Sequence, residues 1–112
     1  MLATLLTSLV HFLDNAFRLD LYPGPRSFTR NSVLLAWLVL PVLAMIAYRA
    51  ATRAAFVAYG LLGFAGLAHY LVPHQHAMPL RCDMTILGEA IASAALVAYV
   101  LSRGPLKTRE EL

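Results

Sequence analysis

The sequence has few charged residues for its length. Of its 112 residues, 13% are charged and 60% are hydrophobic. A soluble domain carries about 25% charged residues, so this chain lacks the surface of a water-soluble protein. Its apolar residues come in long blocks, which predicts an all-α integral membrane protein with one membrane domain over residues 1–112. The lipid bilayer is therefore its first expected partner.

Cysteine and lysine are nearly absent from the chain. The one cysteine, Cys82, excludes an internal disulfide. The formal net charge of +3 comes from nine basic residues against six acidic ones. In a membrane protein, basic residues usually lie at the lipid headgroups, so this charge does not predict binding to nucleic acid.

The motifs of common enzyme classes are also missing. The sequence contains no nucleophile elbow, no phosphate-binding loop and no zinc-protease motif. These absences argue against a hydrolase or an NTPase. A carboxylate such as Glu89 or Asp14 can serve as an acid–base group. Nothing in the sequence names a substrate, however, so it does not favour an enzyme.

Three segments are apolar over the roughly 20 residues that a helix needs to cross the bilayer. They are residues 33–51, 54–72 and 84–102, and a charged tail, 103–112, follows. Pro41 lies inside the first of these segments and is expected to kink it. Trp37 is expected at the membrane interface, where amphipathic rings are enriched.

Small residues on the last two of these segments predict close helix packing in lipid. They recur at Gly60, Gly63 and Gly66 on one segment and around Gly88 on the other. We therefore interpret these glycines as packing positions.

The segment 2–21 is amphipathic, because its polar residues recur every three or four positions. These residues are Thr4, Thr7, Ser8, His11, Asp14, Asn15 and Arg18. Either the segment crosses the membrane with this stripe facing the other helices, or it lies in the interface with the stripe facing water. We favour crossing, because the stripe is narrow and its first half holds only hydroxyl groups. The predicted fold is then a four-transmembrane-helix bundle.

Orientation and location are weakly specified. With the N-terminus inside, five basic residues lie on the cytoplasmic side and four on the other, a split too even for the positive-inside rule. We lean to both termini inside, in the cytoplasmic (inner) membrane of a bacterium.

The ionisable residues of the predicted spans gather in one half of the bundle. If all four segments cross, the loops 22–31 and 73–83 lie on the same side, with His11 about 15 Å and Glu89 about 8 Å below it. Ionisable groups are costly inside a membrane, and their presence there indicates a functional site. The predicted ligand or proton pocket consists of His11, Asp14, Asn15, Arg18, His69 and Glu89.

Structural roles explain the same residues equally well. His11 and Glu89 can form an ion pair that fixes how the helices meet. Asp14 and Arg18 are spaced for a local pair on one helix, which we favour for them. A single helix histidine such as His11 can also be the axial ligand of a tetrapyrrole.

The loop region 69–84 is rich in potential metal ligands. Imidazole, thioether and thiol groups together suit copper better than magnesium or calcium. The candidate ligands are His74, His76, Met78, Cys82 and Met84. Their spacing matches no specific metal-site signature, and an exposed polar loop is the simpler interpretation.

Three functions remain open from the sequence. The first is an accessory or assembly subunit of a larger membrane complex, whose partners would be other membrane-protein subunits. The second is a stand-alone binding or transport protein, with an intramembrane pocket for a cation, a proton or a small amphipathic ligand. The third is a copper-handling protein that uses the loop 69–84. We rank the subunit role slightly above the binding role, although no particular residue decides between them.

Overall fold

The computed structural model describes residues 1–23, 26–73 and 77–103, and within these ranges all of its regular secondary structure is helical. The predicted all-α class is therefore confirmed. The elements, in chain order, are α1 (Leu2–Phe17), the 3₁₀ turn η1 (Leu19–Leu21), α2 (Arg30–Trp37), α3 (Val39–Ala50), α4 (Arg53–Leu62), the 3₁₀ segment η2 (Ala65–Leu71) and α5 (Leu80–Ser102).

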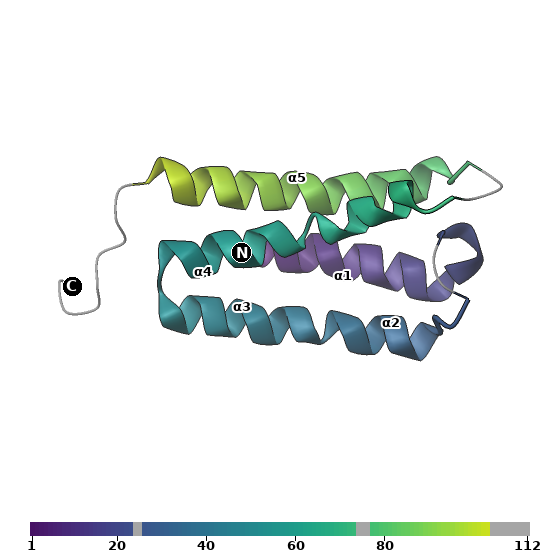
Figure 1. Cartoon of the computed structure of the whole chain (residues 1–112), viewed down its shortest axis with the longest axis horizontal. Helices are drawn as coiled ribbons and strands as arrows, with labels where there is room; N and C mark the ends of the chain where they lie inside the picture. Colours follow the sequence, from purple (N-terminus) through teal and green to yellow (C-terminus); the bar gives the residue numbers. More distant parts are fainter. Residues whose placement is uncertain (24–25, 74–76, 104–112) are drawn as a thin grey trace.

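These elements form four rods that lie side by side (Figure 1). The rods are α1, α2 with α3, α4 with η2, and α5. α1 packs against α5 and α2, and α4 packs against α5 and α3. The end of α1, the start of α2, the end of η2 and the start of α5 all lie at one end of the bundle, which we call the loop end (Figure 1).

Three helical segments are long and apolar enough to cross a membrane: Arg30–Ala50, Arg53–Leu71 and Leu80–Ser102. They correspond to the three predicted spans. The last begins at Leu80 rather than at Met84, because Pro79 occupies its N-cap position and ends the preceding loop. α1 is shorter, with 16 residues.

The first of these segments is interrupted near its proline, as expected. Because Pro41 has no N–H, the carbonyl of Trp37 loses its usual helical partner. The helix breaks at Leu38, whose amide donates to the carbonyls of both Leu34 and Leu35. The start of α2 is fixed by a capping box, in which Thr29 is the N-cap.

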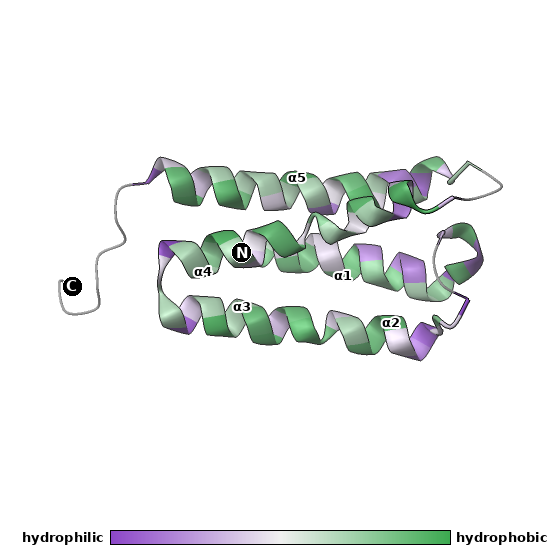
Figure 2. Ribbon diagram, viewed as in Figure 1, coloured by the Kyte–Doolittle hydropathy of each residue, from purple (hydrophilic) through white to green (hydrophobic). Residues whose placement is uncertain are grey.

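The surface of the bundle is largely apolar (Figure 2). Large side chains such as Leu35, Val42, Ile46, Leu87 and Ile91 are exposed. Many interior residues are small or polar, although larger apolar ones such as Ile86 are also buried. The apolar surface suits contact with lipid.

α1 follows the same inverted pattern. Its polar residues Thr4, Ser8 and His11 are buried, whereas Leu6 and Val10 are exposed. The polar stripe therefore faces the other helices. Trp37, which we expected at an interface, instead donates a hydrogen bond from its indole N–H to the Oγ of Ser8 inside the bundle, at 3.1 Å.

The glycines of α4 and η2 allow close packing, as predicted. A Cβ atom at Gly60 would lie 2.7 Å from Val97, and one at Gly63 would collide with Ser93. Both neighbours belong to α5. Gly88 differs from the prediction, because a Cβ there would meet nothing within 4 Å.

Candidate functional site

A buried histidine–glutamate pair joins α1 to α5. The Nδ1 atom of His11 lies 2.5 Å from Oε2 of Glu89, and each residue is only 2% exposed. Gly66 of η2 makes room for this pair, because a Cβ there would lie 2.7 Å from Cε1 of His11 and 3.2 Å from Oε2 of Glu89. The pair therefore ties three of the four rods together.

The second ring nitrogen of His11 has no hydrogen-bond partner among the residues that the structure describes. This atom, Nε2, is buried. The ring is surrounded by other rings, with centroids of Phe12 and Tyr22 at 5.7 Å and of His69 at 5.6 Å. An unpaired buried nitrogen of this kind costs free energy, and such an atom is a candidate for binding a ligand.

A second histidine is held at the loop end by two hydrogen bonds. Nδ1 of His69 lies 2.8 Å from the carbonyl oxygen of Pro23, so this nitrogen carries the proton and donates it. Nε2 of His69 then accepts from the amide nitrogen of Asn15 at 3.1 Å. These bonds fix the neutral tautomer of His69 and connect η2 to α1.

Asp14 is surrounded by donors at the loop end. Its Oδ1 lies 3.2 Å from Nε of Arg18 and 3.2 Å from Nε of Arg81, and its Oδ2 accepts from the Tyr22 hydroxyl at 2.8 Å. The predicted local pair of Asp14 with Arg18 is present. Both guanidinium groups are partly exposed, which places this cluster at the edge of the bundle.

Tyr22 contacts both the His11 ring and Asp14. Burial raises the pKa of its phenol well above the ordinary value, and the hydrogen bond to Asp14 adds to the increase while that to Thr85 opposes it. The phenol therefore stays protonated and can donate to Asp14. Its ring also lies 5.0 Å from that of His69, centroid to centroid.

Four residues of the predicted pocket, His11, Asn15, His69 and Glu89, line a common cavity. Asp14 and Arg18 instead form an ion pair at the edge of this region. The sequence did not identify Tyr22, Arg81 and Thr85 as members of this region. Thr85 shared a helical face with Glu89 and was a visible signal. Tyr22 directly precedes Pro23, so the sequence indicated only the end of a helix there and not a contact with Asp14 or His11.

A cavity beside the His11–Glu89 pair has a volume of about 360 Å³ and extends from α1 to α2, α3, α4 and η2. Its polar wall is formed by His11, Asn15, His69 and Glu89. The rest is mostly apolar and includes Phe12, Phe28, Val33, Ala36, Leu40, Leu62 and Ala65. We call it the deep cavity.

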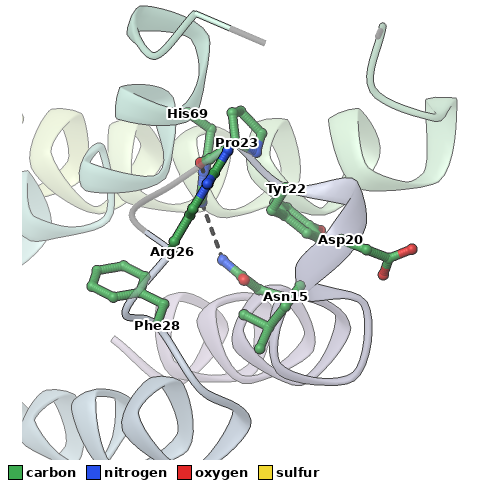
Figure 3. A pocket seen from close by; sticks show the side chains of 8 residues that line it. Asn15, Asp20, Tyr22, Pro23, Arg26, Phe28 and His69 are labelled. Atoms are coloured by element: carbon green, nitrogen blue, oxygen red, sulfur yellow. Dashed lines mark hydrogen bonds between the residues drawn. The ribbon is translucent and has the colours of Figure 1, made fainter. Parts of the chain in front are cut away.

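A second cavity, of about 280 Å³, lies at the loop end and is called the outer cavity. Asn15 and His69 are joined by their hydrogen bond in its wall, while the carboxylate of Asp20 points away (Figure 3). Asn15, His69 and Phe28 line both cavities. The hydrogen bond between Asn15 and His69 therefore lies in the wall that separates the outer cavity from the deep one.

A small void continues the polar region toward the other end of the bundle. It measures about 10 Å³ and is lined by Glu89, Ser93, Thr4, Ser8 and Tyr59, among others. The Oγ of Ser93 is buried without a partner among the described residues. A space of this size holds about one water molecule.

The predicted copper ligands are only partly described. His74 and His76 lie outside the described residues. Cys82 is fully buried, with its sulfur 3.6 Å from Oδ2 of Asp14, whereas Met84 is 64% exposed. In residues 1–23, 26–73 and 77–103, no three His, Cys, Asp or Glu side chains are grouped so as to hold a metal ion. The copper site stays a prediction.

Met78 packs against a buried apolar cluster at the loop end. This cluster consists of Tyr22, Cys82 and Ile86. The contacts give Met78 a packing role that does not require a metal.

Comparison with known proteins gives no match. No family model, no curated protein and no solved structure matches the chain.

Proposed function

We propose that this chain is a four-span membrane protein that binds a small amphipathic molecule inside the bundle. The polar part of the ligand would lie against His11 and Glu89, and its apolar part would fill the rest of the deep cavity. The observation that carries this proposal is the deep cavity itself, which combines a long apolar wall with a buried pair of ionisable residues.

The surface of α1 supports its crossing of the membrane. An interfacial helix would turn its polar stripe to water. Here Thr4, Ser8 and His11 are buried against other helices, while Leu2 and Phe17 are exposed. Exposed leucine and phenylalanine on a helix whose polar side is covered are best placed against lipid. The same argument favours an integral membrane protein.

The size and lining of the deep cavity support ligand binding. Sites for small molecules measure about 300–1,000 Å³ and are mostly apolar with a few polar groups. The deep cavity, at about 360 Å³, lies in this range. A charged or ionisable pair in a membrane is costly, and its retention beside a cavity is better explained by a ligand than by packing alone.

We propose that the ligand reaches the deep cavity through the outer cavity as well as from the bundle surface, where the lining residues Phe28 and Leu62 are exposed. The wall between them contains the hydrogen bond from Asn15 to His69. His69 belongs to η2, a 3₁₀ segment, and such segments have poorer hydrogen-bond geometry than an α-helix. We propose that this bond opens when the ligand passes.

A subunit role is the second candidate, and a different feature favours it. A groove of about 430 Å³ on the outer side of α1 and α5 is lined by Leu6, Val10, Met84 and Gly88. The open space at Gly88 could receive a helix of another membrane protein. Copurification of a stoichiometric partner that is lost on Gly88→Leu would favour this role.

The binding proposal is tested by filling the deep cavity without changing its polar wall. Ala36 lies at the exposed edge of the deep cavity, so Ala36→Phe places a ring at its opening. Ala94→Phe, at an exposed position of α5 that does not line the cavity, is the matched control. Each variant is extracted gently and analysed by native mass spectrometry for bound small molecules. We expect a bound molecule on the wild type and on Ala94→Phe, and its loss on Ala36→Phe. Equal retention by all three proteins would refute the proposal.

A further inference from the structure

Which atoms of the His11–Glu89 pair carry protons determines which ligands can hydrogen-bond to it in the deep cavity. A buried pair is most stable when its net charge is zero, because an uncompensated charge in an apolar interior is costly. Net neutrality is reached in two ways. Either the histidine is an imidazolium beside a carboxylate, or the histidine is neutral beside a protonated carboxyl group.

Both neutral arrangements leave a proton on the same atom of His11. In the ion pair, both ring nitrogens carry a proton. In the uncharged pair with the carboxyl proton of Glu89 on Oε2, the atom that faces His11, this group donates to Nδ1 and the ring proton is on Nε2. The 2.5 Å contact fixes Nδ1 as the atom that faces Glu89. Nε2 is therefore an N–H donor in these two arrangements with zero net charge, whereas a neutral His11 that donated from Nδ1 to an ionised Glu89 would leave a net negative charge in the interior.

This donor has no acceptor in the part of the chain that the structure describes. Nε2 of His11 is buried and unpaired, and the His11 ring lines the deep cavity. The nearby polar groups are already engaged: Nε2 of His69 accepts from Asn15, and the Tyr22 hydroxyl is bonded to Asp14 and Thr85. A ligand that supplies an acceptor oxygen would satisfy it.

The remaining lining selects the type of acceptor. The cavity carries no cationic side chain beyond this pair, so an anionic group would add an uncompensated charge. A cationic group would meet the N–H and be repelled. The aromatic side chains of Phe12 and Phe28 suit a flat apolar group.

Resting on the proposed function, we infer that the ligand is an uncharged, lipid-soluble carbonyl compound. Its carbonyl oxygen accepts a hydrogen bond from Nε2 of His11, and its aryl or alkyl body fills the apolar part of the deep cavity. A shift of the His69 ring, which lies 5.6 Å from that of His11, would open Nε2 to the ligand.

A metal ion is the competing occupant of Nε2. A carboxylate that accepts from one nitrogen of a histidine often supports metal binding at the other. That arrangement would require further ligands, and the described ranges 1–23, 26–73 and 77–103 hold no group of three. The carbonyl ligand is therefore favoured, and metal binding is an outcome of the test.

The test compares two probes that differ only in the carbonyl group, decanophenone and decylbenzene. Their affinities are measured by calorimetry for the protein in lipid nanodiscs, and the ketone is also labelled with ¹³C at its carbonyl for infrared spectroscopy. The key variant replaces both partners with apolar residues, His11→Phe with Glu89→Leu. The ratio of the two affinities is compared between proteins, so that partition of each probe into lipid cancels.

We expect the ratio to favour the ketone in the wild type and to fall about threefold to tenfold in the double variant, as the loss of one hydrogen bond predicts. The ¹³C carbonyl band should move to lower frequency with the wild type, and not with Ala36→Phe. The infrared measurement does not depend on the folding of the double variant.

Other outcomes separate the two proposals. Equal binding of both probes with an unshifted band would overturn the carbonyl inference and leave the binding pocket standing. Binding of neither probe would overturn both. Stronger binding of zinc or copper than of the ketone, abolished by the double variant, would assign Nε2 to a metal instead.

Discussion

Nδ1 of His11 and Oε2 of Glu89 meet at 2.5 Å, although 78 positions separate the two residues in the chain. This contact joins the first helix of the bundle to the last. Each partner is buried beside the deep cavity, so its interaction bears on both stability and binding.

The first prediction concerns the cost of breaking this pair. His11→Ala leaves the Glu89 carboxyl group buried without its partner, and loss of one member of a buried pair costs about 3–5 kcal/mol. We expect a large decrease in thermal stability in detergent. The double variant His11→Phe with Glu89→Leu should be close to wild type, since both polar groups are gone. A His11→Ala protein as stable as the wild type would show that the pair is not formed.

Gly66 provides a second prediction, with a matched control in the same chain. A Cβ atom at Gly66 would press on His11 at 2.7 Å and on Glu89 at 3.2 Å, so Gly66→Ala should destabilise the protein and weaken ligand binding. At Gly88 a Cβ meets nothing within 4 Å. Gly88→Ala should therefore be neutral, or stabilising by up to about 1 kcal/mol through helix propensity. Thermal unfolding of both variants checks the contrast, and equal effects would contradict it.

A third prediction follows from the raised pKa of Tyr22. Burial raises the pKa of this phenol in the folded state, so the unfolded chain ionises first as the pH increases. The contribution of Tyr22 to stability is complete below about pH 10, the ordinary tyrosine pKa, and is lost progressively above it.

The matching variant is Tyr22→Phe, which removes both the ionisation and the donor to Asp14. It should be less stable than wild type by about 1 kcal/mol at neutral pH and should lose stability less steeply above about pH 10. Tyr48→Phe, at an exposed position, serves as the control. Chemical unfolding at several pH values measures both effects. An unchanged slope above pH 10 would rule out this role of Tyr22.

Asn15 gives a prediction about access to the deep cavity. Asn15→Ala removes the hydrogen bond to His69 in the wall between the two cavities. We expect faster association of decanophenone, measured by quenching of Trp37, the one tryptophan in the chain. Asn31→Ala, at an exposed site on α2, is the control. A slower or unchanged rate would place the route into the cavity elsewhere.

Helical periodicity was enough to predict much of this arrangement. The polar residues of α1 step by three or four, so His11 and Asn15 necessarily share a face, and a buried carboxylate at Glu89 needed a partner. The predicted ends of the spans placed these residues in the same half of the bundle. The glycines of α4 and η2 were also recognised as packing positions.

Contacts that depend on how the chain turns were not predictable. η1 brings Tyr22 back over the end of α1, where it reaches Asp14 and Thr85, and periodicity does not describe such a turn. Because α5 begins at Leu80, Cys82 and Met84 lie on a helix and not in the predicted loop 69–84. Cys82 and Met84 lie two positions apart on a helix, about 200° around its axis, so one is buried and the other exposed.

Photolabelling tests the central claim of an intramembrane binding pocket most directly. A benzophenone with a short alkyl tail is itself a lipid-soluble ketone, and on illumination it labels the residues beside its carbonyl. In nanodiscs, we predict labels on Phe12, Val33 and Leu40, which line the deep cavity, and competition by decanophenone. Labels spread over the exposed residues Leu87 and Ile91, without competition, would contradict the account.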